Sequence, residues 1–121
     1  MALQVKRIYD PPAAQDGVRI LVDRIWPRGL SKEEAKLDAW LKGVAPSAAL
    51  RQWFAHDPAK WAEFRRRYFV ELDACGEPLA ELLKMVKHGR ATLLYSAKDT
   101  EHNNAAALAE YLARRYRVKR D

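Results

Sequence analysis

The chain has 121 residues, of which 49% are hydrophobic and 31% charged, as in an ordinary globular protein with one sizeable core. No apolar run approaches the roughly 18 residues of a membrane span, and a single cysteine, Cys75, excludes an internal disulfide. Lys and Arg outnumber Asp and Glu by 22 to 16, which favours an anionic partner. The start of the chain, MALQVKRIYDPP, lacks the apolar segment of a secretion signal, so we expect a cytoplasmic protein without a membrane partner.

Two short apolar segments near the start of the chain predict strands. Leu3–Tyr9 alternates apolar and polar residues and is stopped by the two prolines that follow Asp10. Val18–Val22 is rich in β-branched residues and follows the turn signal Asp16-Gly17. About eight residues separate the two strands, which leaves little room for a helical crossover. The relative direction of the two strands therefore stays open at this point.

The segment after the second strand begins with a capping-box pattern. Ser31 is expected to cap a helix, with Glu34 reaching back to its amide. Leu37–Lys42 fits either a continuation of this helix or a strand with Leu37, Ala39 and Leu41 on one face. We favour a short helix followed by a strand.

Three further helices are predicted in the middle of the chain. Ser47 is the expected cap of a helix that runs to about Ala55. Asp57 and Pro58 fit the N-cap and first turn of a longer helix that ends at Gly76. Pro78–His88 has leucines at helical spacing and a glycine stop.

The apolar run Ala91–Ala97 is typical of a buried central strand. It leads into a polar segment and then an alanine-rich helix that we expect to begin near Thr100, with Asp99 or Thr100 as its N-cap. This order of elements predicts one small α/β domain over residues 1–121, with a mostly parallel sheet of about four strands flanked by helices.

Two predicted strands end in similar polar segments, Asp23–Gly29 and Ser96–Asn104. Ligands of open α/β sheets bind beyond the carboxyl ends of the strands. If the two strands are parallel neighbours, both segments meet at one edge, where the start of the last helix adds its free N–H groups. We therefore expect a pocket for a small anionic molecule there.

The residue types in these segments suggest separate roles. Arg24, Arg28 and Lys98 would hold the anion, since guanidinium groups bind carboxylates and phosphates in a forked geometry. The candidates for proton transfer, if the protein is an enzyme, are Asp23, Asp99 and His102, and the remaining binding candidates are Trp26, Ser96, Asn103 and Asn104.

Each candidate also has a structural interpretation. Asp99 as a helix cap, Trp26 as core packing and His102 as a surface residue are all common arrangements. Neighbouring side chains of a strand point to opposite faces, so we expect at most one of Asp23 and Arg24 to face the site, which favours Arg28 as the ligand contact. The sequence contains no phosphate-loop, dinucleotide-binding or zinc-binding spacing, so no cofactor or metal is predicted.

The alternative function is a non-catalytic nucleic-acid-binding or regulatory module. Its phosphate contacts would come from two basic segments, Arg65–Arg67 and Arg114–Arg120. No helix-turn-helix spacing or RNA-binding aromatic pair accompanies them.

Five longer sequence segments carry a family resemblance: VKRIYDPP, LVDRIWPRGLSKEEA, WLKGVAPS, LRQWFAHDPAKWAEFRRRY and LLYSAKDTEHNNA. Together they resemble the YeaO-like family of bacterial proteins, a domain of unknown function, from about Val5 to Leu112. The resemblance implies a small cytoplasmic α/β domain. It assigns no catalytic residue, cofactor or substrate to the chain, and it makes the polar segments above the natural candidates for a site.

Overall fold

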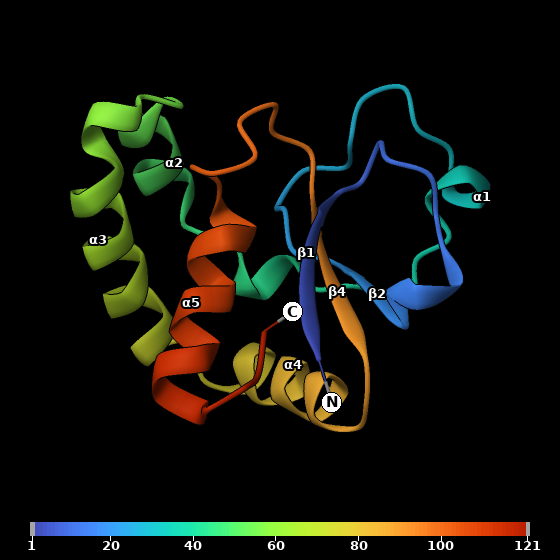
Figure 1. The fold of residues 1–121 in the computed structure, drawn as a ribbon. Helices are drawn as coiled ribbons and strands as arrows, with labels where there is room; N and C mark the ends of the chain where they lie inside the picture. Colours follow the sequence, from blue (N-terminus) through green and yellow to red (C-terminus); the bar gives the residue numbers. More distant parts are fainter. Residues whose placement is uncertain (1, 121) are drawn as a thin grey trace.

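A sheet of four strands forms the centre of the molecule (Figure 1). The computed structural model describes residues 2–120, and these form four strands, five α-helices and three short 3₁₀ helices. The strands are β1 (Leu3–Arg7), β2 (Val18–Leu21), β3 (Ala39–Trp40) and β4 (Ala91–Tyr95). The α-helices are α1 (Lys32–Ala35), α2 (Ala48–Phe54), α3 (Trp61–Asp73), α4 (Glu77–Lys87) and α5 (Asn104–Tyr116). The 3₁₀ helices are Ala14–Asp16, Lys42–Val44 and Pro58–Lys60.

The strand order is β1-β4-β2-β3, and every pairing is parallel. In the register, Leu93 of β4 lies between Val5 of β1 and Ile20 of β2. The predicted small α/β fold with a mostly parallel sheet of about four strands is therefore confirmed. The direction that the sequence left open is now defined, because β1 and β2 both run parallel to the strand between them.

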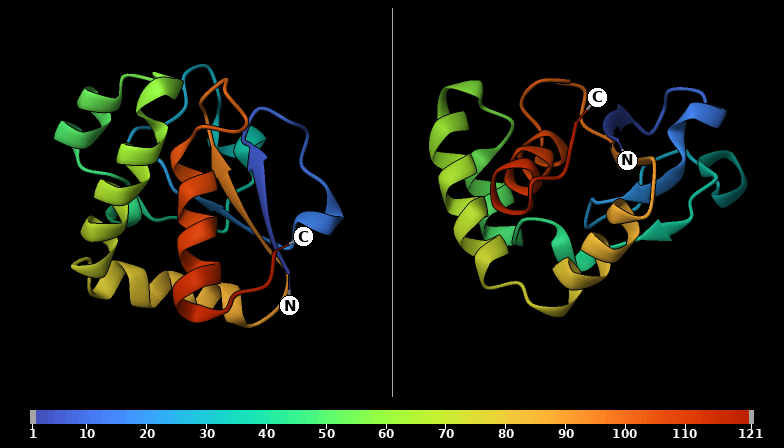
Figure 2. Two further views of the ribbon diagram at one scale, coloured as in Figure 1. Left: turned by 60° about the vertical axis from the view of Figure 1, so that its left-hand side comes forward. Right: turned by 60° about the horizontal axis from the view of Figure 1, so that its bottom comes forward.

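The two faces of the sheet are covered unequally (Figures 1 and 2). Ile20, Leu93 and Tyr95 belong to the larger core, which the helices α2 to α5 cover. Leu21 and Leu94 point the other way, into a smaller core that contains Ala35 of α1 and is completed by the side chains of Ile8, Trp26, Leu30, Leu37 and Trp40. Since the side chains of a strand alternate between faces, β4 contributes to both cores and all five of its residues are buried.

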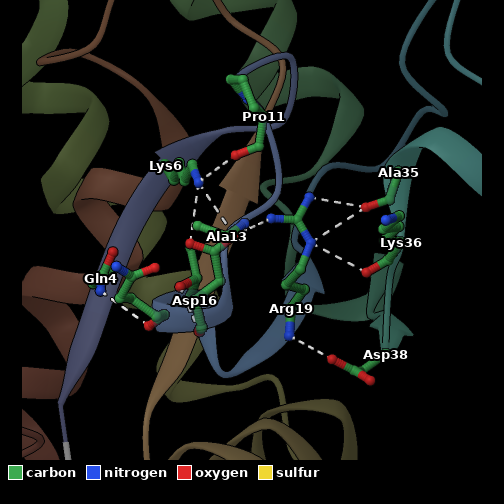
Figure 3. A network of polar contacts seen from close by, with 11 residues as sticks. Gln4, Lys6, Pro11, Ala13, Asp16, Arg19, Ala35, Lys36 and Asp38 are labelled. Carbon is green, nitrogen blue, oxygen red and sulfur yellow. Dashed lines mark hydrogen bonds and ion pairs between the residues drawn. The ribbon is translucent and has the colours of Figure 1, made fainter.

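The connection from β1 to β2 is fixed by a buried polar network on the α1 side of the sheet (Figure 3). The Asp16 carboxylate pairs with the Arg19 guanidinium and with Lys6 Nζ, and it accepts a hydrogen bond from the Ala13 N–H. Arg19 also donates to the Ala35 carbonyl at the end of α1. Only 2% of Asp16 and 5% of Arg19 are exposed, so these charges stabilise the fold only because they are paired.

The predicted helix starts are largely confirmed. Ser31 accepts the Glu34 N–H and completes the expected capping box, and Ser47 accepts the Leu50 N–H at the start of α2. Asp57 caps the 3₁₀ turn that leads into α3. One boundary was wrong, because α3 ends at Asp73 and Gly76, with φ +75°, precedes α4 instead.

The segment Leu37–Lys42 forms the short strand that we favoured, reduced to the two residues of β3. Strands β1 and β4 each end two residues earlier than predicted. None of the helices in the described part of the chain combines the length and apolar character that a membrane crossing requires.

Candidate functional site

The C-terminal ends of the strands open into a cleft with a volume of about 800 Å³. The segments that follow β2 and β4 lie at this end of the sheet together with α2 (Figure 1). They meet because β2 and β4 are parallel neighbours. All ten predicted site residues line the cleft: Asp23, Arg24, Trp26, Arg28, Ser96, Lys98, Asp99, His102, Asn103 and Asn104.

Asp23 ties the ends of the two strands together. Its Oδ2 accepts hydrogen bonds from the Ser96 N–H, at 3.0 Å, and from the Ser96 hydroxyl, at 2.8 Å. Its Oδ1 accepts a hydrogen bond of 3.0 Å from Asn104 Nδ2, which also donates to the Val22 carbonyl. The carboxylate therefore joins β2, β4 and the start of α5, and three donors from this framework occupy its oxygens.

Asp23 and Arg24 both line the cleft, so the expectation that at most one of them faces the site was wrong. The strict alternation of a strand no longer applies to them, because β2 ends at Leu21. The Arg24 guanidinium donates to the carbonyls of Ala45 and Pro46, just before α2. These bonds hold the β2 end against the α2 side of the cleft, and within residues 2–120 the charge of Arg24 has no acidic partner.

The segment between β4 and α5 is built around Asp99. Its Oδ1 accepts the N–H groups of Glu101 and His102, at 2.9 and 3.0 Å, and its Oδ2 lies 2.9 Å from His102 Nδ1. The hydrogen bond from the Glu101 N–H, followed by those from His102, holds the pKa of the Asp99 carboxyl below its usual value. The His102 ring meets Trp61 of α3 edge to face, with centroids 5.3 Å apart.

The start of α5 was predicted too early. The helix begins at Asn104, and its N-cap is Asn103, whose side chain accepts the Ala106 N–H at 2.8 Å. Asp99 accepts N–H groups two and three residues ahead as an N-cap does, but the chain bends again before the helix starts. His102 therefore precedes the helix instead of lying in its first turn, and Thr100 does not cap it.

Sequence reasoning missed two parts of the lining. Arg7 is the last residue of β1 and Tyr9 follows the strand at the same edge. Arg7 Nε donates to the Ala97 carbonyl, and the Tyr9 hydroxyl donates to the Arg28 carbonyl. The polar end of the first predicted strand would have indicated both residues had its direction been known. The other missed part belongs to α2, α3 and the residue after α2's cap, and consists of Arg51, Phe54, His56 and Phe64.

The α2 end of the cleft has a well-defined aromatic wall. The rings of Phe54 and Phe64 stack with centroids 4.4 Å apart, and Trp61 packs against both. Ala55 and His56 follow with φ values of +48° and +56°, a conformation that is uncommon for residues other than glycine. This turn brings His56 to the cleft, and no local sequence signal indicates it.

The cleft carries an excess of positive charge. Five Arg or Lys side chains line it, namely Arg7, Arg24, Arg28, Arg51 and Lys98. Its acidic side chains are Asp23 and Asp99. Within residues 2–120 none of the five cations forms an ion pair with a carboxylate.

Five Arg side chains of the two basic segments named as a nucleic-acid surface pair with acidic neighbours. Arg66 and Arg67 both bind Glu63, and Arg65 binds Glu110 across to α5. In the second segment, Arg114 binds Glu110 and Arg115 binds Asp73. Within residues 2–120, Arg117, Lys119 and Arg120 form no ion pair with a carboxylate, so the pairing covers the first segment and only the helical part of the second.

Comparison with known proteins identifies the family of this chain. The family model described as the inactive DUF488-N3 subclade matches residues 2–121. The uncharacterized protein YeaO of Escherichia coli is 45% identical over 112 residues, which cover 93% of this chain and 97% of that protein. The uncharacterized protein Rv3073c of Mycobacterium tuberculosis is 39% identical over 110 residues, which cover 91% of this chain and 92% of that protein. No solved structure resembles the chain closely enough to count as a match.

Proposed function

The chain belongs to the DUF488-N3 subclade described as inactive, and on this premise we propose that the protein binds a small anionic ligand at the C-terminal edge of its sheet without converting it. Binding and catalysis have different requirements for the residues of a site. A binding site needs complementary charge, whereas an acid or base catalyst also needs a group that exchanges a proton with the substrate. The residues of the cleft support the first requirement better than the second.

The observation that carries the proposal is the unpaired positive charge. The five Arg and Lys side chains of the cleft face two carboxylates, and no ion pair within residues 2–120 neutralises any of the five. The side-chain bonds of Arg7 and Arg24 go to neutral carbonyls. Several cations held close together repel one another, and an anion between them relieves that repulsion.

The state of the two carboxylates argues against either of them acting as a general acid. Asp23 accepts three hydrogen bonds from Ser96 and Asn104, so its oxygens serve the framework of the cleft. The Asp99 carboxyl is held ionised by the N–H groups that it accepts, since its pKa lies below the usual value. A general acid at neutral pH needs the opposite shift. The word "inactive" in the subclade's description agrees with this interpretation.

Isothermal titration calorimetry at low ionic strength tests the proposal, with phosphate, pyrophosphate and benzoate as probes. We expect at least one probe to bind, with an affinity that falls as salt is added. Arg28→Ala is expected to weaken that binding about tenfold to a hundredfold, since a hydrogen bond to a charged group contributes about 1.5–3 kcal/mol. Arg28 is exposed and its side chain forms no bond within the described residues, so the fold should tolerate the change.

Arg90→Ala is the matched control. Arg90 is also exposed, but it precedes β4 and therefore lies at the opposite end of the sheet from the cleft. We expect this variant to bind every probe as the natural protein does. The absence of binding by all three probes at about 10 mM, where a binding free energy of about 2.7 kcal/mol already gives half occupancy, would overturn the proposal. An equal loss of binding in both variants would overturn it as well.

A further inference from the structure

The cleft combines its positive charge with exposed apolar surface. Of the four large hydrophobic side chains that are exposed within residues 2–120, two line this cleft, Tyr9 at 38% and Ile25 at 54% exposure. Trp26 follows Ile25 and also lines it. We call these three side chains the apolar shelf. Isolated exposed hydrophobic residues are ordinary, but their grouping in a concave site indicates a surface that a ligand covers.

Two of the three side chains of the shelf, those of Tyr9 and Trp26, are held in place by contacts outside it. The Tyr9 hydroxyl donates to the Arg28 carbonyl at 2.7 Å, and Trp26 Nε1 donates to the Leu30 carbonyl at 2.7 Å. The Trp26 ring also packs edge to face against Trp40, with centroids 5.3 Å apart. Because these hydrogen-bond donors are used within the protein, what the two rings offer a ligand is apolar surface at a fixed position.

Positive charge lies directly beside the shelf. The Arg7 guanidinium lies 4.7 Å from the centroid of the Tyr9 ring, and Arg28 is joined to Tyr9 through its carbonyl. A ligand on the shelf would therefore meet cations within the same short stretch of the cleft. A bare inorganic anion would leave the apolar surface uncovered and would fill little of the 800 Å³ volume, which lies in the range of sites for larger organic ligands.

We infer that the ligand is an organic anion in which a flat, apolar ring carries the negative group, such as an aryl phosphate or an aryl carboxylate. This inference rests on the proposed function, since it specifies the class of anion that the cleft takes. The ring lies on the shelf formed by Tyr9, Ile25 and Trp26, and the negative group meets Arg7 and Arg28. Burial of a ring removes apolar surface from water, which strengthens binding beyond the charge contacts alone.

Calorimetry with methyl phosphate and phenyl phosphate distinguishes the contribution of the ring to the affinity from that of the charge, because the two esters differ only in their apolar part. We expect phenyl phosphate to bind at least tenfold more tightly. Ile25→Ser should reduce the affinity for phenyl phosphate several-fold and leave that for methyl phosphate unchanged. Val70→Ser is the matched control, because Val70 is 58% exposed on α3 away from the cleft, and it should change neither affinity.

The outcomes distinguish this inference from the proposal on which it rests. If both esters bind equally well, or if Ile25→Ser leaves the advantage of phenyl phosphate intact, the inference is overturned and anion binding stands. If neither ester binds and the probes of the earlier experiment fail as well, both are overturned. Benzoate binding more tightly than acetate, with the same dependence on Ile25, would support the carboxylate form of the ligand.

Discussion

Replacing Asp16 by Asn is expected to lower the free energy of unfolding by about 3 kcal/mol. The side chain keeps its shape and can still accept the Ala13 N–H, but the negative charge that balances Arg19 and Lys6 is lost. Because Arg19 is only 5% exposed, water cannot replace that charge. Removing one partner of a buried ion pair costs about 3–5 kcal/mol, and the retained hydrogen bond favours the lower end of that range.

Urea denaturation at pH 7, followed by circular dichroism, measures this loss. For a domain of this size, about 3 kcal/mol corresponds to a fall in Tm of roughly 12 °C. The control is Arg114→Ala, which removes an exposed ion pair with Glu110 and should cost about 0–1 kcal/mol. A loss for the Asp16 variant no larger than that of the control would refute the reasoning that the buried network stabilises the fold.

The difference between the two proteins should also depend on pH in a defined direction. Burial raises the pKa of the Asp16 carboxyl, but the hydrogen bonds from the Ala13 N–H, Lys6 and Arg19 together hold it below the usual value. A group whose pKa is lower in the folded state contributes its stabilisation fully above the unfolded value, near 3.9, and loses it as the pH falls through the folded value. We therefore expect a constant difference between pH 7 and 5 that shrinks below about pH 4.

Three further substitutions test other parts of the structure. Gly17→Ala should cost roughly 3 kcal/mol or more in the same urea denaturation, because φ is +64° and an added Cβ would lie 2.1 Å from a backbone oxygen. Its control, Gly29→Ala, has open space around the added Cβ and should cost only about 1 kcal/mol. Asp23→Asn should lower stability by about 2 kcal/mol and speed hydrogen exchange at the start of α5, because an amide cannot accept all three of the hydrogen bonds that the carboxylate accepts. Asp99→Asn should destabilise the protein at pH 7, and its difference from the natural protein in urea melts should vanish in acid, where the carboxyl with its lowered pKa becomes protonated.

Local patterns predicted those parts of the fold that local interactions determine. The segment Ala91–Ala97 was predicted as a buried strand, because it is nearly continuously apolar and too short for a buried helix. Ser31 and Ser47 were predicted as caps because a cap bonds within three residues of itself. The predicted start of α5 was wrong because local bonds alone do not distinguish two candidate caps. Asp99 and Asn103 both make cap-like bonds, and the sequence does not rank them.

The candidate site depended on contacts between distant segments, and these were predicted only in part. The polar ends of β2 and β4 were expected to meet if the strands were parallel neighbours, and they are. The direction of β1 was open, so Arg7 and Tyr9 were missed. Phe54 and His56 reach the cleft through the packing of α2 against α3 and a left-handed turn, and neither has a signature in single-sequence patterns.

The position of β4 determines when the protein can fold. β4 is the last strand in the chain, yet it lies between β1 and β2, and those two strands make no hydrogen bonds to each other. A nascent chain that has emerged only as far as the end of α4 therefore holds β1, β2 and β3 but lacks the strand that joins β1 to β2. Parallel pairings between residues so far apart in sequence form slowly, because a long loop must close before any contact compensates for the lost entropy. We therefore expect the complete sheet, both of its cores and the cleft at its edge to form late in synthesis, when Ala91–Tyr95 pairs with β1 and β2.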